Sequence, residues 1–247
     1  MGLSRFDHIL WFTSAVLATL IIVRIRQQRL LVSPLNSFAW MLGAVVTRDA
    51  LLSIPAYDTH AYAVLWELSL PFLLAAQLWA GYDTLRAVAR LYPKIGKFAI
   101  RLFLTCLAVT VAVCCLTVPF ELHLLQGGEK LLRALFLLNR SVDSWIAGTL
   151  ILVSLFFARS PAPEKQPPRN LVLHTVLLSI YFGTYAVLFL AENLAPLGAL
   201  AALERTQFFV VAVLYASWAI SLSRGGEKSE PWPQLDVIVL ETLHQRS

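Results

Sequence analysis

Residues 171–191 read LVLHTVLLSIYFGTYAVLFLA and contain no Asp, Glu, Lys or Arg. As an α-helix this stretch is about 30 Å long, because each residue adds about 1.5 Å, and that length matches the hydrocarbon core of a bilayer. Six further stretches are also apolar and long enough to cross a bilayer, although some of them contain charged residues. The sequence therefore predicts an all-α membrane protein, a bundle of seven transmembrane helices over about 7–24, 36–57, 61–82, 98–119, 132–157, 171–191 and 204–222.

The composition of the whole chain also indicates a membrane protein. Of the 247 residues, 58% are hydrophobic and only 14% are charged, and the mean hydropathy is +0.68. A soluble domain carries about a quarter charged residues, so an ordinary soluble enzyme is excluded. The chain has a net charge of +5, and its basic residues lie in short loops between apolar runs. That distribution is typical of membrane loops rather than of nucleic-acid binding.

The basic residues predict the orientation of the bundle. With the N-terminus outside, 14 Lys and Arg fall in the inner segments and 4 in the outer segments, while the other 2 of the 20 lie inside spans. Cytoplasmic loops are enriched in Lys and Arg. We therefore expect residues 1–224 to form a transmembrane domain in a bacterial inner (plasma) membrane, N-terminus out and C-terminus in. Residues 225–247 are expected to form a short cytoplasmic tail.

The segment 83–97 extends the third span with Arg86 and Arg90, which are four residues apart. A basic helical turn at the cytoplasmic surface favours anionic lipid headgroups as partners. A solvated helix end explains the same pattern, and both interpretations stay open.

Five ionisable residues lie deep within the predicted spans, more than five residues from either end. A charge near the centre of a transmembrane helix costs about 2.5–3.5 kcal/mol, and the second span carries two. At about 1.5 Å per residue, all five lie about 9–17 Å below the outer surface, so we expect them to converge in one interior patch between the second, third and fifth spans. A polar stripe on one face of the fifth span extends the patch. The predicted network consists of Arg48, Asp49, Glu67, Asn139, Arg140, Asp143 and Ser144.

Two interpretations of this network stay open. In the first, Arg48 pairs with Glu67 or Asp143 and Arg140 pairs with Asp49, and these ion pairs fix which helices pack together. In the second, the charges form a polar pocket, open to the outside, that binds an ion or a small polar ligand. Acidic residues exceed basic ones by one, which favours a proton or cation. Polar residues of the sixth and seventh spans could complete the shell: Tyr181, Thr184, Tyr185, Gln207 and Tyr215.

A second set of polar residues lies at the outer ends of the spans. Histidines with acidic neighbours can hold zinc, but outer loops ordinarily contain such residues, and we predict no metal, no cofactor and no catalytic residue. No two histidines are four residues apart, unlike in ceramidases and adiponectin receptors, and the seventh span has no lysine to bind retinal. The residues of this set are Asp7, His8, Asp58, His60, Glu121 and His123.

Four short features resemble a group of uncharacterised bacterial seven-span membrane proteins. They are Asp7-His-Ile-Leu-Trp-Phe12 at the start of the first span, Trp66-Glu67 in the third, Arg140-Ser-Val142 in the fifth, and the short C-terminal tail. The resemblance implies a topology and a membrane location, and it brings no activity or catalytic residue.

The sequence favours a membrane sensor or signalling scaffold with an outward-facing polar pocket inside the membrane. The alternative is a small-solute or proton-coupled transporter, in which the charges of the second and fifth spans would mark two three-helix repeats of opposite orientation. An intramembrane metal-dependent hydrolase is less favoured, because no Ser-His, Cys-His or paired metal-ligand arrangement lies at one depth.

Overall fold

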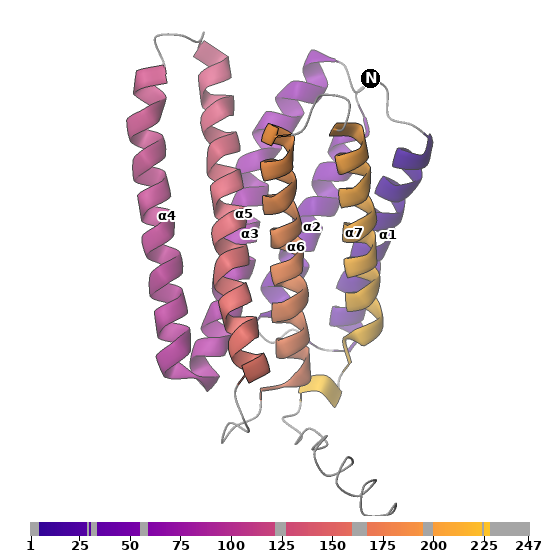
Figure 1. The fold of residues 1–247 in the computed structure, drawn as a ribbon. Coiled ribbons are helices and arrows are strands. Elements are labelled where there is room, and N and C mark those ends of the chain that lie inside the picture. Colours follow the sequence, from indigo (N-terminus) through magenta and orange to yellow (C-terminus); the bar gives the residue numbers. More distant parts are fainter. Residues whose placement is uncertain are drawn as a thin grey trace, which may run out of the picture.

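The chain folds into long α-helices and one short 3-10 helix (Figure 1). The computed structural model describes residues 5–28, 30, 34–54, 59–121, 127–159, 167–194, 200–223 and 225–227, and these ranges contain no strand. The predicted all-α class is confirmed. The elements are α1 (Arg5–Gln27), α2 (Leu35–Leu52), α3 (His60–Leu91), α4 (Pro93–Glu121), α5 (Gly127–Arg159), α6 (Arg169–Leu194), α7 (Leu200–Ser221) and η2 (Gly225–Glu227).

Each predicted span falls on one of the long helices. Within the described residues, five of these helices are long and apolar enough to cross a bilayer: α1, α3, α4, α5 and α6. The chain therefore has the helices of a membrane protein. The second predicted span extends to residue 57, whereas α2 ends at Leu52 with Ser53 as its C-cap. Helix α2 has 18 residues and carries both Arg48 and Asp49, and these two charges lower its hydropathy.

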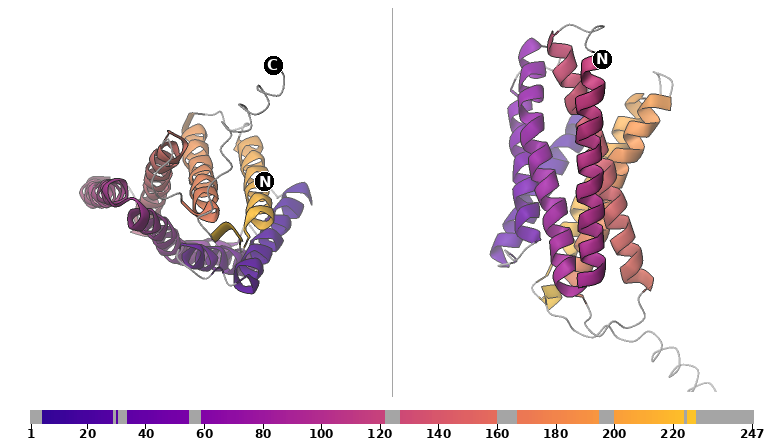
Figure 2. Two further views of the ribbon diagram at one scale, coloured as in Figure 1. Left: turned by 90° about the horizontal axis from the view of Figure 1, so that it is seen from below. Right: turned by 90° about the vertical axis from the view of Figure 1, so that its left-hand side faces the viewer.

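The helices form a ring with one helix outside it (Figure 2). Helices that follow each other in the chain pack as neighbours, and α1 packs against α7, which closes a ring of α1, α2, α3, α5, α6 and α7. Helix α4 lies outside this ring and packs on α3 and α5. The start of α1 and the end of α7 lie at opposite ends of the bundle (Figure 1).

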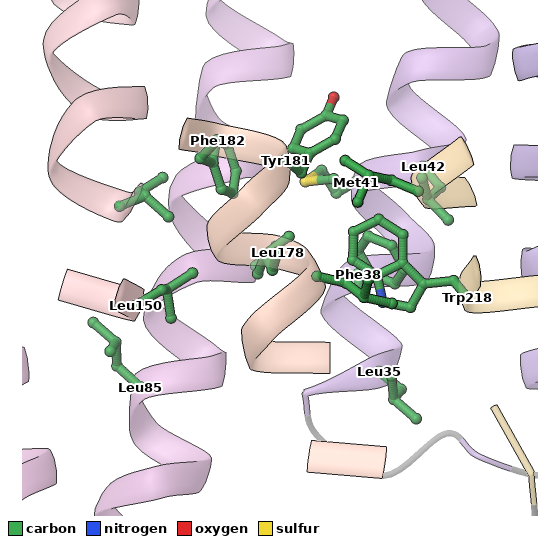
Figure 3. Close-up of a cluster of buried hydrophobic side chains, with 14 of the residues drawn as sticks. Leu35, Phe38, Met41, Leu42, Leu85, Leu150, Leu178, Tyr181, Phe182 and Trp218 are labelled. Atoms are coloured by element: carbon green, nitrogen blue, oxygen red, sulfur yellow. The ribbon is translucent and has the colours of Figure 1, made fainter. Parts of the chain in front are cut away.

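The core lies inside the ring, where buried apolar side chains of α2, α3, α5, α6 and α7 meet (Figure 3). Phe38 of α2 packs its ring on Trp218 of α7, with 4.6 Å between the ring centroids. Large apolar side chains also cover the outside: Phe12 is 70% exposed, and Phe72 and Ile220 are 76% exposed. An apolar outer surface of this kind suits a lipid environment.

Basic side chains gather at one end of the bundle, which we call the basic end. It contains the corner where α3 passes into α4, the ends of α1, α5 and α7, and the starts of α2 and α6. At the opposite end the described basic side chain is Arg205. The exposed basic residues of the basic end are Arg26, Arg86, Arg90, Lys94, Lys97, Arg101, Arg159 and Arg169.

Several sequence predictions fall outside the described residues. They include the helix predicted in the tail, most of the proline-rich loop near 159–170, and most of the set of outer His, Asp and Glu side chains. Among the described residues no group of three His, Cys, Asp or Glu could hold a metal ion.

Candidate polar site inside the bundle

The most deeply buried charge of the predicted network is Asp143 of α5, which is 0% exposed. Its Oδ2 accepts a hydrogen bond from Asn139 Nδ2 one turn earlier, at 3.4 Å. Its Oδ1 has no hydrogen-bond partner among the described residues, and neither has Asn139 Oδ1. Buried polar atoms in proteins are almost always hydrogen-bonded, and a buried carboxylate without partners is costly in its charged form. Asp143 therefore needs either a proton or a positively charged neighbour.

Three tyrosines of α6 and α7 lie beside the buried carboxylates. The hydroxyl of Tyr181 is hydrogen-bonded to those of Tyr185 and Tyr215, and the rings of Tyr181 and Tyr215 stack with centroids 6.1 Å apart. Tyr185 interacts electrostatically with both Asp143 and Asp49, and Tyr215 interacts with Asp49. We call Asp49, Asp143, Tyr181, Tyr185 and Tyr215 the carboxylate–tyrosine cluster. It joins α2, α5, α6 and α7.

Asp49 also links the cluster to α1, because its side chain forms a hydrogen bond with the side chain of Trp11. The indole nitrogen is a donor only, so the Asp49 carboxylate accepts this bond. Trp11 belongs to the short motif at the start of the first span, and its sequence context predicted no role for it.

Arg48 makes its direct contacts with α3, although it precedes Asp49 in the chain and interacts electrostatically with Asp49 and Tyr185. Its Nε donates to Ser69 Oγ at 3.1 Å, and its guanidinium carbon lies 5.2 Å from the ring centroid of Trp66. Consecutive residues lie about 100° apart around a helix, so Arg48 faces α3 while Asp49 faces the tyrosines and α1. The direct contacts of Arg48 are thus a hydroxyl and an aromatic ring, beside its electrostatic interactions with Asp49 and Tyr185, and the predicted pair with Glu67 or Asp143 is not among the described contacts.

The other members of the predicted network take different positions. Arg140 and Glu67 are half-buried, and Glu67 makes no hydrogen bond or ion pair with the described part of the chain. Ser144 is exposed, and its hydroxyl donates to the Arg140 carbonyl oxygen at 2.8 Å. The prediction that Ser144 belongs to an inward-facing stripe is wrong, because it follows Asp143 by one residue and therefore lies on another face of α5.

A second polar group lies closer to the basic end. His174 of α6 is fully buried, and its Nε2 is 3.2 Å from Thr84 Oγ1 of α3. Thr84 donates its own hydroxyl hydrogen to the Ala80 carbonyl oxygen at 2.8 Å, so His174 Nε2 carries the hydrogen of the first bond. His174 Nδ1 and Trp218 Nε1 have no hydrogen-bond partner among the described residues.

Helix α3 carries a buried polar residue, Gln77, near the level of the carboxylate–tyrosine cluster, and Thr84, which contacts His174, further along the same helix. Gln77 of α3 is 3% exposed, and its Oε1 has no hydrogen-bond partner within the described ranges. A Cβ on Gly81 would lie 3.2 Å from Ile146, which places Gln77 near the level of Asp143. Thr84 lies seven residues beyond Gln77, about 10 Å along the helix. Polar side chains thus line the interior from the carboxylate–tyrosine cluster to His174.

Sequence reasoning missed Gln77, His174 and Trp11 because they carry no formal charge. A charge inside an apolar run stands out, whereas a Gln, a neutral His or a Trp lowers the hydropathy of its span only slightly. Comparison with known proteins finds no match, since no family model, no curated protein and no solved structure is similar to the chain.

Proposed function

We propose that the protein is a seven-span sensor of the bacterial inner membrane, N-terminus out and C-terminus in, whose carboxylate–tyrosine cluster binds a proton or a small cation. The observation that carries the proposal is the Asp143 carboxylate, which is fully buried and has one oxygen without a hydrogen-bond partner in the described part of the chain. The gathering of basic side chains at one end of the bundle supports the orientation.

The charge balance of the cluster favours a positive ligand. Asp49 and Asp143 both interact with Tyr185, and Arg48, which contacts Ser69 and Trp66 on α3, brings one positive charge against these two negative ones. Two ionised carboxylates in a buried site repel each other and lose hydration, and a proton or cation relieves both effects. The rings of Tyr181 and Tyr215 are at most 2% exposed, so a ligand that fits without opening the bundle is small.

The path from the cluster to the basic end supports a sensor. Helices α6 and α7 supply the tyrosines, and their other ends are tied together, since Asn170 Nδ2 donates to the Ser223 carbonyl oxygen at 2.7 Å. Arg24 of α1 donates to the Leu222 carbonyl oxygen at 2.8 Å. A shift of α7 that follows binding at Tyr215 would therefore reach the start of the C-terminal tail, where a cytoplasmic partner would detect it.

A proton-coupled transporter is the second candidate. The specific observation in its favour is the polar lining that continues from Asp143 past Gln77 to His174 and Thr84. A sensor needs one site, whereas a transporter also needs a path between that site and the membrane surface, and these residues lie between Asp143 and the basic end.

The binding experiment uses the full chain in nanodiscs, with the melting temperature measured against pH and against NaCl or KCl. Wild-type protein should be stabilised by protons or by one of the cations, because a ligand that binds the folded state raises its stability. Asp143→Asn should lose that dependence. Ser144→Ala, an exposed neighbour on the same helix, should keep it. An unchanged dependence in Asp143→Asn would overturn the proposal.

Two further measurements test the rest of the proposal. A reporter active only in the cytoplasm should work when fused after Ser247 and fail after His60, and the reverse result would contradict the orientation. Proteoliposomes with an imposed pH gradient separate the two candidates, since proton flux or solute uptake that depends on His174 would favour the transporter.

A further inference from the structure

The corner between α3 and α4, at the basic end, is a place of very close backbone approach. A Cβ atom on Gly96 of α4 would overlap the backbone of Ala89 of α3, so the approach requires glycine. Tyr92, between the two helices, packs its ring on Phe156 and Phe157 of α5, with centroids 5.4 and 6.0 Å away. The corner is thereby fixed to α5 on one side.

Two arginines of α3 project from the other side of this corner. Residues around a helix are spaced by about 100°, so Arg86 and Arg90 lie about 60° and 100° from Ala89 in the same rotational sense. Gly81, which touches Ile146 of α5, lies about 80° from Ala89 in the opposite sense. Arg86 and Arg90 are both exposed, as expected for a face turned away from α5.

Two basic residues of α4 reach the same side. Lys97 and Arg101 lie about 100° and 140° from Gly96, and because α4 runs antiparallel to α3, this rotation brings them to the side of Arg86 and Arg90. Both side chains are exposed. The close approach at Gly96 therefore collects four positive charges, from two helices, on one outward surface.

Apolar side chains continue this surface toward the middle of the bundle. Trp79 of α3 is 49% exposed and Leu104 of α4 is 47% exposed. They lie about 12–15 Å from the Gly96–Ala89 contact, since they are ten and eight residues from it along their helices. The acidic residue nearest to this surface on α3, Asp83, accepts a hydrogen bond from Ser37 of α2 at 2.9 Å and is half-buried. We call Trp79, Arg86, Arg90, Lys97, Arg101 and Leu104 the α3–α4 face.

We propose that the α3–α4 face binds one anionic phospholipid, with the phosphate among the four basic side chains and an acyl chain along Trp79 and Leu104. Charge complementarity selects an anionic headgroup, because Lys and Arg next to a membrane surface attract acidic lipids. The exposed apolar residues select a lipid over a soluble phosphate, because a headgroup without a tail leaves Trp79 and Leu104 without a partner. The role of α4, outside the ring, is then to complete a lipid site.

The test uses the full chain in mild detergent, with native mass spectrometry and melting curves during titration with phosphatidylglycerol or phosphatidylcholine. Wild-type protein should retain one phosphatidylglycerol and melt several degrees higher with it than with phosphatidylcholine. The quadruple variant R86Q/R90Q/K97Q/R101Q should bind phosphatidylglycerol at least about tenfold more weakly, because the lipid headgroup then has none of the four basic side chains as partners. The matched control is R26Q/R159Q/R169Q, which removes exposed basic residues of the same end and should behave as wild type.

Two further measurements distinguish binding of a whole phospholipid from binding of its headgroup alone. Glycerol phosphate, which has the headgroup charge without acyl chains, should give no stabilisation, and Trp79→Ala should weaken phosphatidylglycerol binding. Full binding by the quadruple variant, or equal stabilisation by glycerol phosphate, would overturn the proposal. Asp143→Asn should bind the lipid as wild type does, so this inference and the proposed cation site fail or succeed separately.

Discussion

Helices α4 and α6 have similarly apolar sequences but different places in the bundle, since α4 lies outside the ring and α6 is part of it. Both were predicted as spans from long apolar runs, and both meet the length and composition of a membrane-crossing helix. Helix α4 lies outside the ring with Phe98 63% exposed, whereas α6 packs on α3, α5 and α7 and leaves at most 2% of His174 and Tyr181 exposed. An apolar run therefore predicts that a helix crosses, and it leaves the place of that helix in the bundle undetermined.

The uncharged polar residues indicate whether a helix lies inside the bundle or at its outside. Polar side chains are expensive in lipid and turn toward other helices, so a helix rich in them belongs inside. On α6 the buried polar residues are Asn170, His174, Thr175 and Ser179, whereas on α4 the one described buried polar side chain is Thr110. The following predictions test this contrast.

The largest effect is expected from removing an aromatic ring of α6. Tyr181→Ala should lower the free energy of unfolding by about 3–5 kcal/mol, because it leaves a cavity between Tyr185, Tyr215 and Trp218. The matched change on α4, Val109→Ala, removes a side chain that is 55% exposed and should change stability by about 0.5 kcal/mol or less. Melting curves in detergent measure both. Equal losses would show that α4 is packed like α6.

A smaller loss is expected at the corner that attaches α4 to the ring. Gly96→Ala places a methyl group against the backbone of Ala89, and overpacking of this kind costs about 1–3 kcal/mol. Gly43→Ala is the control, because a Cβ there meets nothing within 4 Å and alanine favours the helix. The same melting assay applies. A harmless Gly96→Ala would mean that the corner can open without cost.

The hydrogen bonds between α6 and the end of α7 should contribute less to the free energy of unfolding than the Gly96 corner does. Asn170→Ala removes the bond from Asn170 Nδ2 to the Ser223 carbonyl oxygen and the 3.4 Å bond from the Ser223 amide. We expect a loss of about 1–2 kcal/mol, at about 1 kcal/mol per hydrogen bond. Faster hydrogen exchange of the Ser223 and Gly226 amides would identify the cause. Unchanged exchange would show that these bonds do not hold the segment.

The smallest effect has the opposite sign. Asp143→Asn removes a buried charge whose Oδ1 has no hydrogen-bond partner in the described ranges, so we expect a gain of about 1 kcal/mol at pH 7 in the absence of added cation. Chemical denaturation of the reconstituted protein would measure it. A loss instead of a gain would indicate that the carboxylate has a partner essential to packing, as the ion-pair interpretation of the sequence requires.

The sequence predicted the positions of the helices well because apolar length is a local property. It also indicated that Arg48, Asp49, Glu67, Arg140 and Asp143 share a depth and that polar residues of the sixth and seventh spans could complete their shell. In the structure, Tyr185 and Tyr215 of that shell interact with the carboxylates. The pairing of Arg48 could not be predicted in this way. Depth along a helix is readable from residue number, whereas the direction of a side chain depends on how each helix is rotated in the bundle.

Ser144 and Trp11 are two further cases in which the direction of a side chain could not be predicted from its position in the sequence. Ser144 shares the depth of Asp143 but not its direction, and Trp11 reaches the cluster from a helix that was not expected to take part. Rotation of a helix is set by the sum of its packing contacts, most of them with residues far away in the chain.

The contact between Arg24 and the last turn of α7 has a consequence for biosynthesis. The two residues of the shorter bond, Arg24 and Leu222, are 198 positions apart, so α1 leaves the ribosome and enters the membrane long before its partner exists. Until α7 arrives, the ring stays open and the inward faces of α1 and α2, with Asp49 among them, have no protein neighbour on that side. The hydrogen bond from Arg24 to the Leu222 carbonyl oxygen can form only after α7 has packed on α1, because a basic side chain binds the free carbonyl oxygens at the end of a helix. This bond therefore forms at the step that closes the ring.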